Sequence, residues 1–172
     1  MTSLTTATRF NVEATLNKWL FDALSAFTRP AWLTTMPAFV FNAEEITASL
    51  PCFAITHIPA GMADLWQGRA VGDGYAGRRA LGLLSVSCYV TRTANPNWTA
   101  QLRTMRDMVS STATASRTVV IQEYQADPVN PTATTFKINL EDTQETPTEA
   151  DPNPAIERAR VLITYSFTFR AN

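Results

Sequence analysis

R-A-R-V-L-I-T-Y-S-F-T-F-R, residues 158–170, is the stretch that decides the fold predicted for this chain. Its apolar and aromatic residues fall on alternate positions, namely Val161, Ile163, Tyr165, Phe167 and Phe169. Successive side chains of a strand point to opposite faces, so a period of two indicates a long strand with one buried face. Because β-branched and aromatic residues favour extended backbone, we expect a central strand of an antiparallel sheet here.

Further strands are predicted on both sides of this stretch in the sequence. Apolar runs or alternating patterns occur at residues 37–42, 50–58, 78–91, 117–125 and 134–141. The 50–58 strand is expected to begin at Pro51, because proline cannot donate to a sheet ladder. The 78–91 stretch is largely apolar on both faces, which indicates a second central strand.

Two helices are predicted from apolar residues at steps of three and four. In residues 12–27 these are Leu16, Trp19, Leu20, Ala23, Leu24 and Phe27, with Asn11 as the expected N-cap. The second helix is expected at residues 98–109, and the Ser, Thr and Ala tract at 110–116 is interpreted as a connector. The helices should lie on the sheet, with their polar sides in water.

The predicted fold is a single α+β domain over residues 1–172, with two helices packed on a mainly antiparallel sheet. A chain of 172 residues is long enough to build one such core. Three segments fall outside it in this interpretation. They are a flexible arm at 1–10, a glycine-bearing long loop at 59–77, and an extended acidic hairpin or arm at 126–155.

Composition restricts the classes of function. The net charge is -1 and the 14 Lys and Arg residues are scattered, which does not favour binding to nucleic acid or to an acidic membrane. No apolar run is long enough to cross a bilayer, and residues 1–10 lack the pattern of a secretory signal, so synthesis in the cytoplasm is expected. Cys52 and Cys88 suit small buried side chains better than a disulfide, with a cross-strand thiol pair as the alternative.

The residues that could act in catalysis or ligand binding are better explained by structural roles. His57 is the only histidine and has only distant acid or nucleophile candidates, so a structural or surface role is favoured. Gly72, Gly74 and Gly77 have dinucleotide-loop spacing, but a strand follows them instead of a helix, which favours a flexible loop. We expect no catalytic, cofactor-binding or metal-binding residues.

Charged residues on loops allow two further alternatives. Glu44 with Glu45, or the acidic run at 141–151, could bind a divalent cation, although solvated loop charges are the usual explanation. Arg78, Arg79 and Arg92 could contact phosphate, although pairing with acidic neighbours fits the low net charge better.

The order of these patterns resembles the tail terminator (tail completion) family of long-tailed bacteriophages. The residues that carry the resemblance are the helix at 12–27, the Phe-rich strand after it, P-C-F-A-I-T-H-I at 51–58, R-A-L-G-L-L-S-V-S-C-Y-V at 79–90, the helix after Asn95-Pro96 and V-L-I-T-Y-S-F at 161–167. The glycine-rich loop and the long acidic segment at 127–154 depart from the family pattern.

The resemblance implies a structural virion protein and not an enzyme. It implies a hexameric ring that caps the tail tube, ends its polymerisation and joins the tail to the head connector, while DNA passes through the lumen without specific binding. The implied partners are further copies of the chain, the tail tube protein and head–tail connector proteins. Subunits are expected to join edge to edge through their sheets.

The expected contact residues lie in the long loop and the acidic arm. Aromatic anchors should dominate, because interface energy concentrates in a few large side chains. The set is Met62, Leu65, Trp66, Arg69, Tyr75, Arg78, Arg79, Glu141, Asp142 and Glu145. Alternative functions are a head-completion or neck connector protein, a tail tube subunit, or a small hydrolase or ligand-binding domain that uses His57.

Overall fold

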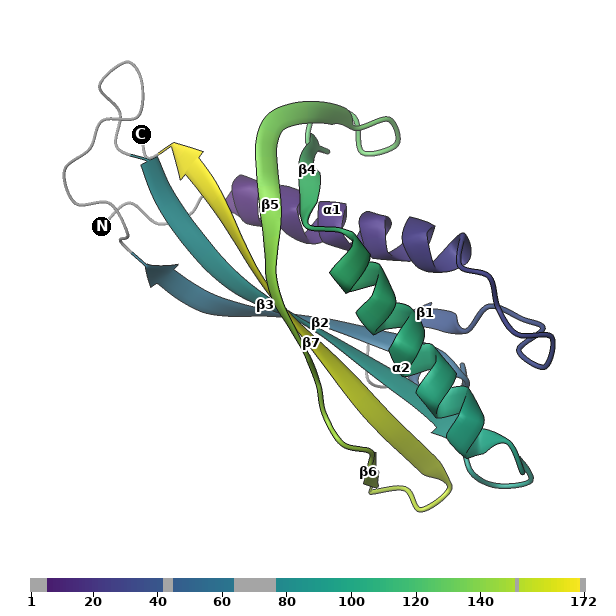
Figure 1. Cartoon of the computed structure of the whole chain (residues 1–172). Coiled ribbons are helices and arrows are strands. Elements are labelled where there is room, and N and C mark those ends of the chain that lie inside the picture. Colours follow the sequence, from purple (N-terminus) through teal and green to yellow (C-terminus); the bar gives the residue numbers. More distant parts are fainter. Residues whose placement is uncertain (1–5, 42–44, 64–76, 151, 171–172) are drawn as a thin grey trace.

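A mostly antiparallel, curled sheet with two helices forms the α+β domain of the computed structural model (Figure 1). The structure describes residues 6–41, 45–63, 77–150 and 152–170. The elements in chain order are α1 (Thr6–Ser25), β1 (Ala38–Val40), β2 (Cys52–Ala63), β3 (Gly77–Thr91), α2 (Trp98–Ala115), β4 (Thr118–Glu123), β5 (Thr132–Glu145), β6 (Glu149–Ala150) and β7 (Ile156–Arg170). The fold class predicted from the sequence is confirmed.

The sheet order is β1-β2-β3-β7-β5-β4, and the short β6 pairs with one end of β7. Only β1 and β2 run parallel; all other described pairings are antiparallel. β7 lies between β3 and β5, as the alternation in residues 158–170 predicts. β3 is also central, with β2 on its other side, which confirms the prediction for 78–91.

The core lies between one face of the sheet and the two helices. Alternate residues of β7 from Ala159 to Phe167 are buried on this face. They join one apolar cluster with residues of both helices: Val12, Leu16, Leu20 and Leu24 of α1, and Leu102, Met105, Met108 and Val109 of α2. Because these residues recur at steps of three and four, each helix buries one stripe, as predicted.

The sheet curls so that α1 contacts both of its ends. At one end, the Thr15 hydroxyl accepts a hydrogen bond from the backbone N–H of Gln122 in β4 at 2.9 Å. At the other end, Asn17 bonds His57 of β2, and the Phe21 ring meets the Phe39 ring of β1 edge to face at 5.0 Å. α1 therefore joins the first and last strands of the sheet order.

Both helices are longer than predicted. α1 is already helical from Thr6, so the flexible arm at 1–10 is wrong for residues 6–10, while residues 1–5 lie outside the described part. Asn11 is inside the helix and buried, so it is not the N-cap. α2 continues to Ala115 because Thr112 and Ala113 pack into the core, so the connector expected at 110–116 is wrong.

Two segments predicted to leave the sheet remain in it for part of their length. β2 continues through the first residues of the expected 59–77 loop, where Met62 pairs with Ala80 of β3. β5 continues to Glu145, which pairs with Val161 of β7. The expected hairpin or arm at 126–155 is therefore an antiparallel hairpin of β5 and β7 up to Glu145, and the alternative of a free arm is wrong there. The physical reason is that the long neighbours β3 and β7 offer backbone partners well past the apolar runs.

Asn11 connects α1 to β4 through two long-range hydrogen bonds. Its amide Nδ2 donates to the Glu123 carboxylate at 2.8 Å, and its Oδ1 accepts from the Tyr124 backbone N–H at 3.1 Å. Replacing Asn11 with Ala leaves that N–H without a partner, at a cost of about 1.5 kcal/mol. We expect urea unfolding of Asn11→Ala to show this loss as a lower midpoint with an unchanged slope.

Asn97 provides the matched control for this measurement. It precedes α2, and its side chain makes no capping hydrogen bond. We expect Asn97→Ala to stay within about 0.5 kcal/mol of the parent protein. Equal losses in the two variants would contradict the role given to Asn11.

Candidate interaction surface

α1 carries a second row of mostly apolar side chains beside the stripe that enters the core, on the side next to β1 and β2. Phe10, Ala14, Asn17 and Phe21 follow one another at steps of four, three and four residues. Phe10 is 52% exposed and Phe21 is 50% exposed. A surface helix normally has one apolar stripe, and single exposed apolar residues need no explanation. Two half-exposed phenylalanines on one stripe indicate a surface that accepts a partner.

A groove of about 560 Å³ runs beside this stripe. Phe21 of α1, Phe39 of β1 and Phe41 just after β1 line it, and Phe41 is 58% exposed. Lys18 and Asp22 also line this groove, and they form an ion pair with 2.8 Å between Lys18 Nζ and Asp22 Oδ2. The groove thus combines apolar walls with one positive and one negative charge, which is typical of interface pockets.

Tyr124 also lines this groove. Its side chain is only 8% exposed, and its hydroxyl has no hydrogen-bond partner in the described part of the chain. A buried hydroxyl without a partner costs free energy.

A second groove, of about 580 Å³, lies on the other side of Lys18 and Asp22. Tyr124 lines it too, together with Val120 of β4 and the turn that carries Val129. Val129 is 82% exposed, and the Asp127 carboxylate fixes its turn by accepting the Val129 and Asn130 backbone N–H groups. The exposed apolar surface therefore extends across α1 from β1 to the β4–β5 turn.

The two sides of the sheet, at β4 and at β1 with β2, differ in how their strand edges are covered. α1 side chains bind the backbone N–H groups of Gln122 and Tyr124 at the β4 side. β1 covers β2 only from Cys52 to Ala54, and beyond Ala54 no described strand pairs with that edge. Pro59 and a bulge between Pro59 and Met62 interrupt the remainder, so the regular open edge is residues 55–58. An open edge can accept a further strand.

His57 lies on β2 and faces α1. Its Nε2 donates to the Asn17 side-chain oxygen at 2.8 Å, because a carboxamide oxygen only accepts. Burial lowers the pKa of His57 to about 4, so the imidazole is neutral at pH 7. The Nδ1 atom is buried without a hydrogen-bond partner among the described residues. A neutral histidine bonded to an amide fits the structural role favoured from the sequence.

The two cysteines are free thiols on opposite faces of the sheet. Cys88 belongs to the main core cluster, whereas Cys52 packs with Val40, Tyr89 and Ile156 in a smaller cluster. Burial raises the pKa of Cys52 to about 11 and raises the pKa of Cys88 as well. The prediction of small buried side chains is confirmed, and a cross-strand thiol pair is excluded by their opposite faces.

Seven predicted contact residues belong to the loop and its flanks. Leu65, Trp66, Arg69 and Tyr75 lie outside the described residues, as do Gly72 and Gly74. Met62, Arg78 and Arg79 are strand residues of β2 and β3, paired with Ala80, Phe169 and Thr168. Their contact role stays a prediction.

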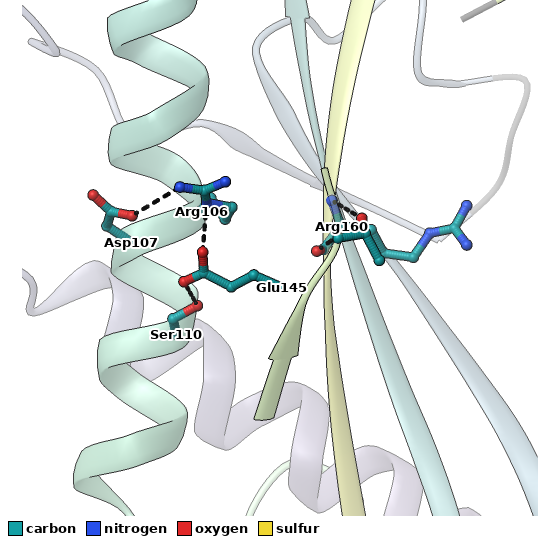
Figure 2. A network of polar contacts seen from close by, with 6 residues as sticks. Arg106, Asp107, Ser110, Glu145 and Arg160 are labelled. Atoms are coloured by element: carbon teal, nitrogen blue, oxygen red, sulfur yellow. Dashed lines mark hydrogen bonds and ion pairs between the residues drawn. The ribbon is translucent and has the colours of Figure 1, made fainter. Parts of the chain in front are cut away.

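The three acidic contact residues are in β5, within the segment expected to form an extended acidic hairpin or arm. Figure 2 shows Glu145 between two residues of α2: Arg106 Nε lies 2.9 Å from its Oε2, and the Ser110 hydroxyl donates to Oε1 at 2.6 Å. Glu141 accepts a hydrogen bond from the buried Ser166 hydroxyl. The Asp142 carboxylate accepts from the Gln144 amide at 2.8 Å. Glu145 thus joins β5 to α2 and Glu141 joins β5 to β7, whereas the Asp142 contact stays within β5. The contact role of the three acids stays a prediction.

Further arginines in the described part of the chain also lie beside acids. Arg92 Nη1 lies 3.0 Å from Glu157, which confirms for this arginine that an acidic neighbour is its partner. Arg158 Nη2 lies 2.9 Å from Glu149, and Arg160 points away from the Arg106 cluster (Figure 2). Within the described ranges, no three His, Cys, Asp or Glu residues come together in a way that could hold a metal ion. Neither α1 nor α2 is long and apolar enough to cross a membrane.

The aromatic surface on α1 was missed in the sequence, although a signal for it is present. Phe10 and Phe21 are eleven residues apart, which is three turns of a helix, so they share a face. The deeper stripe of Leu16, Leu20 and Leu24 dominates the pattern. A test for a second stripe on the same helix would have identified the surface.

Comparisons with known proteins give the fold and no function. No protein-family model matches the chain, and no curated protein is similar to it. The chain is similar to a solved structure whose name states no function, with a TM-score of 0.54 and 13% sequence identity. The likeness covers 94% of this chain and 96% of the other. At this identity it supports the shared fold alone.

Proposed function

We propose that the chain is a structural protein of a bacteriophage tail, which forms a hexameric ring, caps the tail tube, ends its polymerisation and joins the tail to the head connector. Its place would be the virion, and its action would be binding without chemistry. The resemblance of the element order to the tail terminator family motivates the proposal. The partners are copies of the chain, the tail tube protein and connector proteins.

The observation that supports the proposal is a group of exposed aromatic side chains on one side of the domain. Phe21 and Phe41 are about half exposed beside a 560 Å³ groove, and Phe10 extends the same side of α1. Aromatic side chains in such positions supply much of the energy of protein interfaces. A protein that works by assembly needs surfaces of this kind.

Edge pairing in a ring could use the part of β2 that extends past β1. The β4 side is covered at Gln122 and Tyr124 by α1, whereas residues 55–58 of β2 are open past β1. A ring closes through unlike surfaces on its two sides. We therefore place the β2 edge of one subunit against a surface of the next subunit other than its covered β4 edge.

A measurement of mass and shape tests the proposal. The full chain is purified, its mass is measured by light scattering, and it is imaged in negative stain alone and with isolated tail tubes. We expect rings of six times the monomer mass that bind tube ends. Long tubes from the protein alone would instead identify a tube subunit. A species that neither forms rings nor binds tubes would overturn the proposal.

A further inference from the structure

We propose that the exposed face of α1 binds the same face of a second copy of this chain, with the two helices antiparallel about a two-fold axis. This goes beyond the proposed ring, because ring contacts join unlike surfaces whereas a two-fold contact joins a surface to itself. The paired units are two rings if the ring forms, and two single subunits otherwise.

The apolar part of the contact is the α1 stripe with its groove. Phe10 and Phe21 lie eleven residues apart, which is about 16 Å along a helix axis. Phe39 and Phe41 continue this apolar surface from Phe21 into the groove. Its exposed rings leave water when a second apolar helix packs against them, which is the main driving force of association.

The charges select the partner and its orientation. Lys18 and Asp22 are one helical turn apart, both line the groove, and their side chains are 56% and 55% exposed. In an antiparallel pair whose axis passes near residue 20, Lys18 of each copy lies beside Asp22 of the other. A parallel pair would bring like charges together, which costs free energy. A strongly acidic or basic partner gains nothing from a neutral pair, so the charge pattern matches a second copy.

Charge reversal tests this pairing directly. In Lys18→Asp both positions are acidic, and in Asp22→Lys both are basic, so each variant repels itself in the proposed contact. We expect each variant to weaken pairing by about tenfold or more in sedimentation equilibrium. An equimolar mixture of the two variants should pair nearly as tightly as the parent protein, because every contact is again between opposite charges.

Two further variants serve as a disrupting variant and as a control. Phe21→Asp should abolish pairing, because it puts a charge into the apolar contact. Lys137→Asp is the matched control, since Lys137 is exposed on β5 and lines neither groove, and it should pair like the parent protein. Circular dichroism of each variant verifies that the fold is retained.

The outcomes separate this inference from the proposed function. Rings of normal mass whose pairing is unaffected by Lys18→Asp and Asp22→Lys would overturn the two-fold contact and leave the ring standing. Parent protein that stays unpaired at every concentration would overturn it as well. Charge-dependent pairs of single subunits without any ring would support the contact and count against the ring.

Discussion

Replacing Gly82 with Val is expected to lower the free energy of unfolding by about 3 kcal/mol. Gly82 on β3 faces Tyr165 on β7 across the sheet. A Cβ at residue 82 would lie within 2.7 Å of the ring atoms Cζ, Oη and Cε2 of Tyr165. The ring is buried and stacks on Phe167 at 6.5 Å between centroids, so it has little room to move. Chemical denaturation measures the loss.

A double-mutant cycle identifies the ring as the cause. Tyr165→Leu removes the aromatic ring and carries its own cost, but it opens the space above residue 82. The Gly82→Val, Tyr165→Leu double variant should therefore lose at least about 1 kcal/mol less than the sum of the two single losses. Strict additivity would show that the introduced valine is harmful for another reason.

The central strands of the sheet could be predicted because the burial of apolar side chains determines both their alternating sequence pattern and their position in the sheet. From Arg158 to Tyr165 each buried position alternates with a less buried one, and β7 packs the buried face on both helices. Burial of apolar area is the dominant favourable contribution to folding, so a pattern that encodes it is reliable. The same reasoning placed Leu16, Leu20 and Leu24 in the core.

The ends of the elements could not be predicted from local pattern, because tertiary contacts extend them. Residues 110–115 are Ser, Thr and Ala, which are not uniformly strong helix formers. They continue α2 because Thr112 and Ala113 fill space against the core. Glu141 to Glu145 look like a solvated acidic run, yet β7 supplies a backbone partner for this segment. Long-range pairing overrides local composition in both cases.

The candidate surface on α1 could not be predicted from the sequence, because tertiary contacts also determine which side of α1 is exposed. Asn17 belongs to the polar side of α1 when the helix is considered alone, but in the fold it bonds His57 and lies beside Ala14 and Phe21. When one helix has two apolar stripes, their patterns overlap in the sequence. The stripe that enters the core is then recognised, and the more exposed stripe is not. Only the curl of the sheet around α1 shows which side remains free for a partner.

Acid is expected to weaken the fold through His57 by about 2 to 3 kcal/mol between pH 7 and pH 4. The folded pKa is about 4, below the ordinary value of 6.5, because burial disfavours the charged imidazole. Between these two values the unfolded chain binds a proton that the folded chain does not. The stabilising contribution is therefore complete above pH 6.5 and is lost as the pH falls toward 4. Protonation also leaves the charge at Nδ1 buried without a partner among the described residues.

His57→Gln is the matched variant for this measurement, because glutamine can donate to Asn17 and does not titrate. Carboxylates also begin to titrate below pH 5, so the informative quantity is the difference between parent and variant. We expect this difference in unfolding free energy to change by about 2 to 3 kcal/mol in favour of the variant from pH 7 to pH 4. Parallel stability curves over that range would show that water reaches the ring of His57 and that the helix–strand contact does not depend on its neutral form.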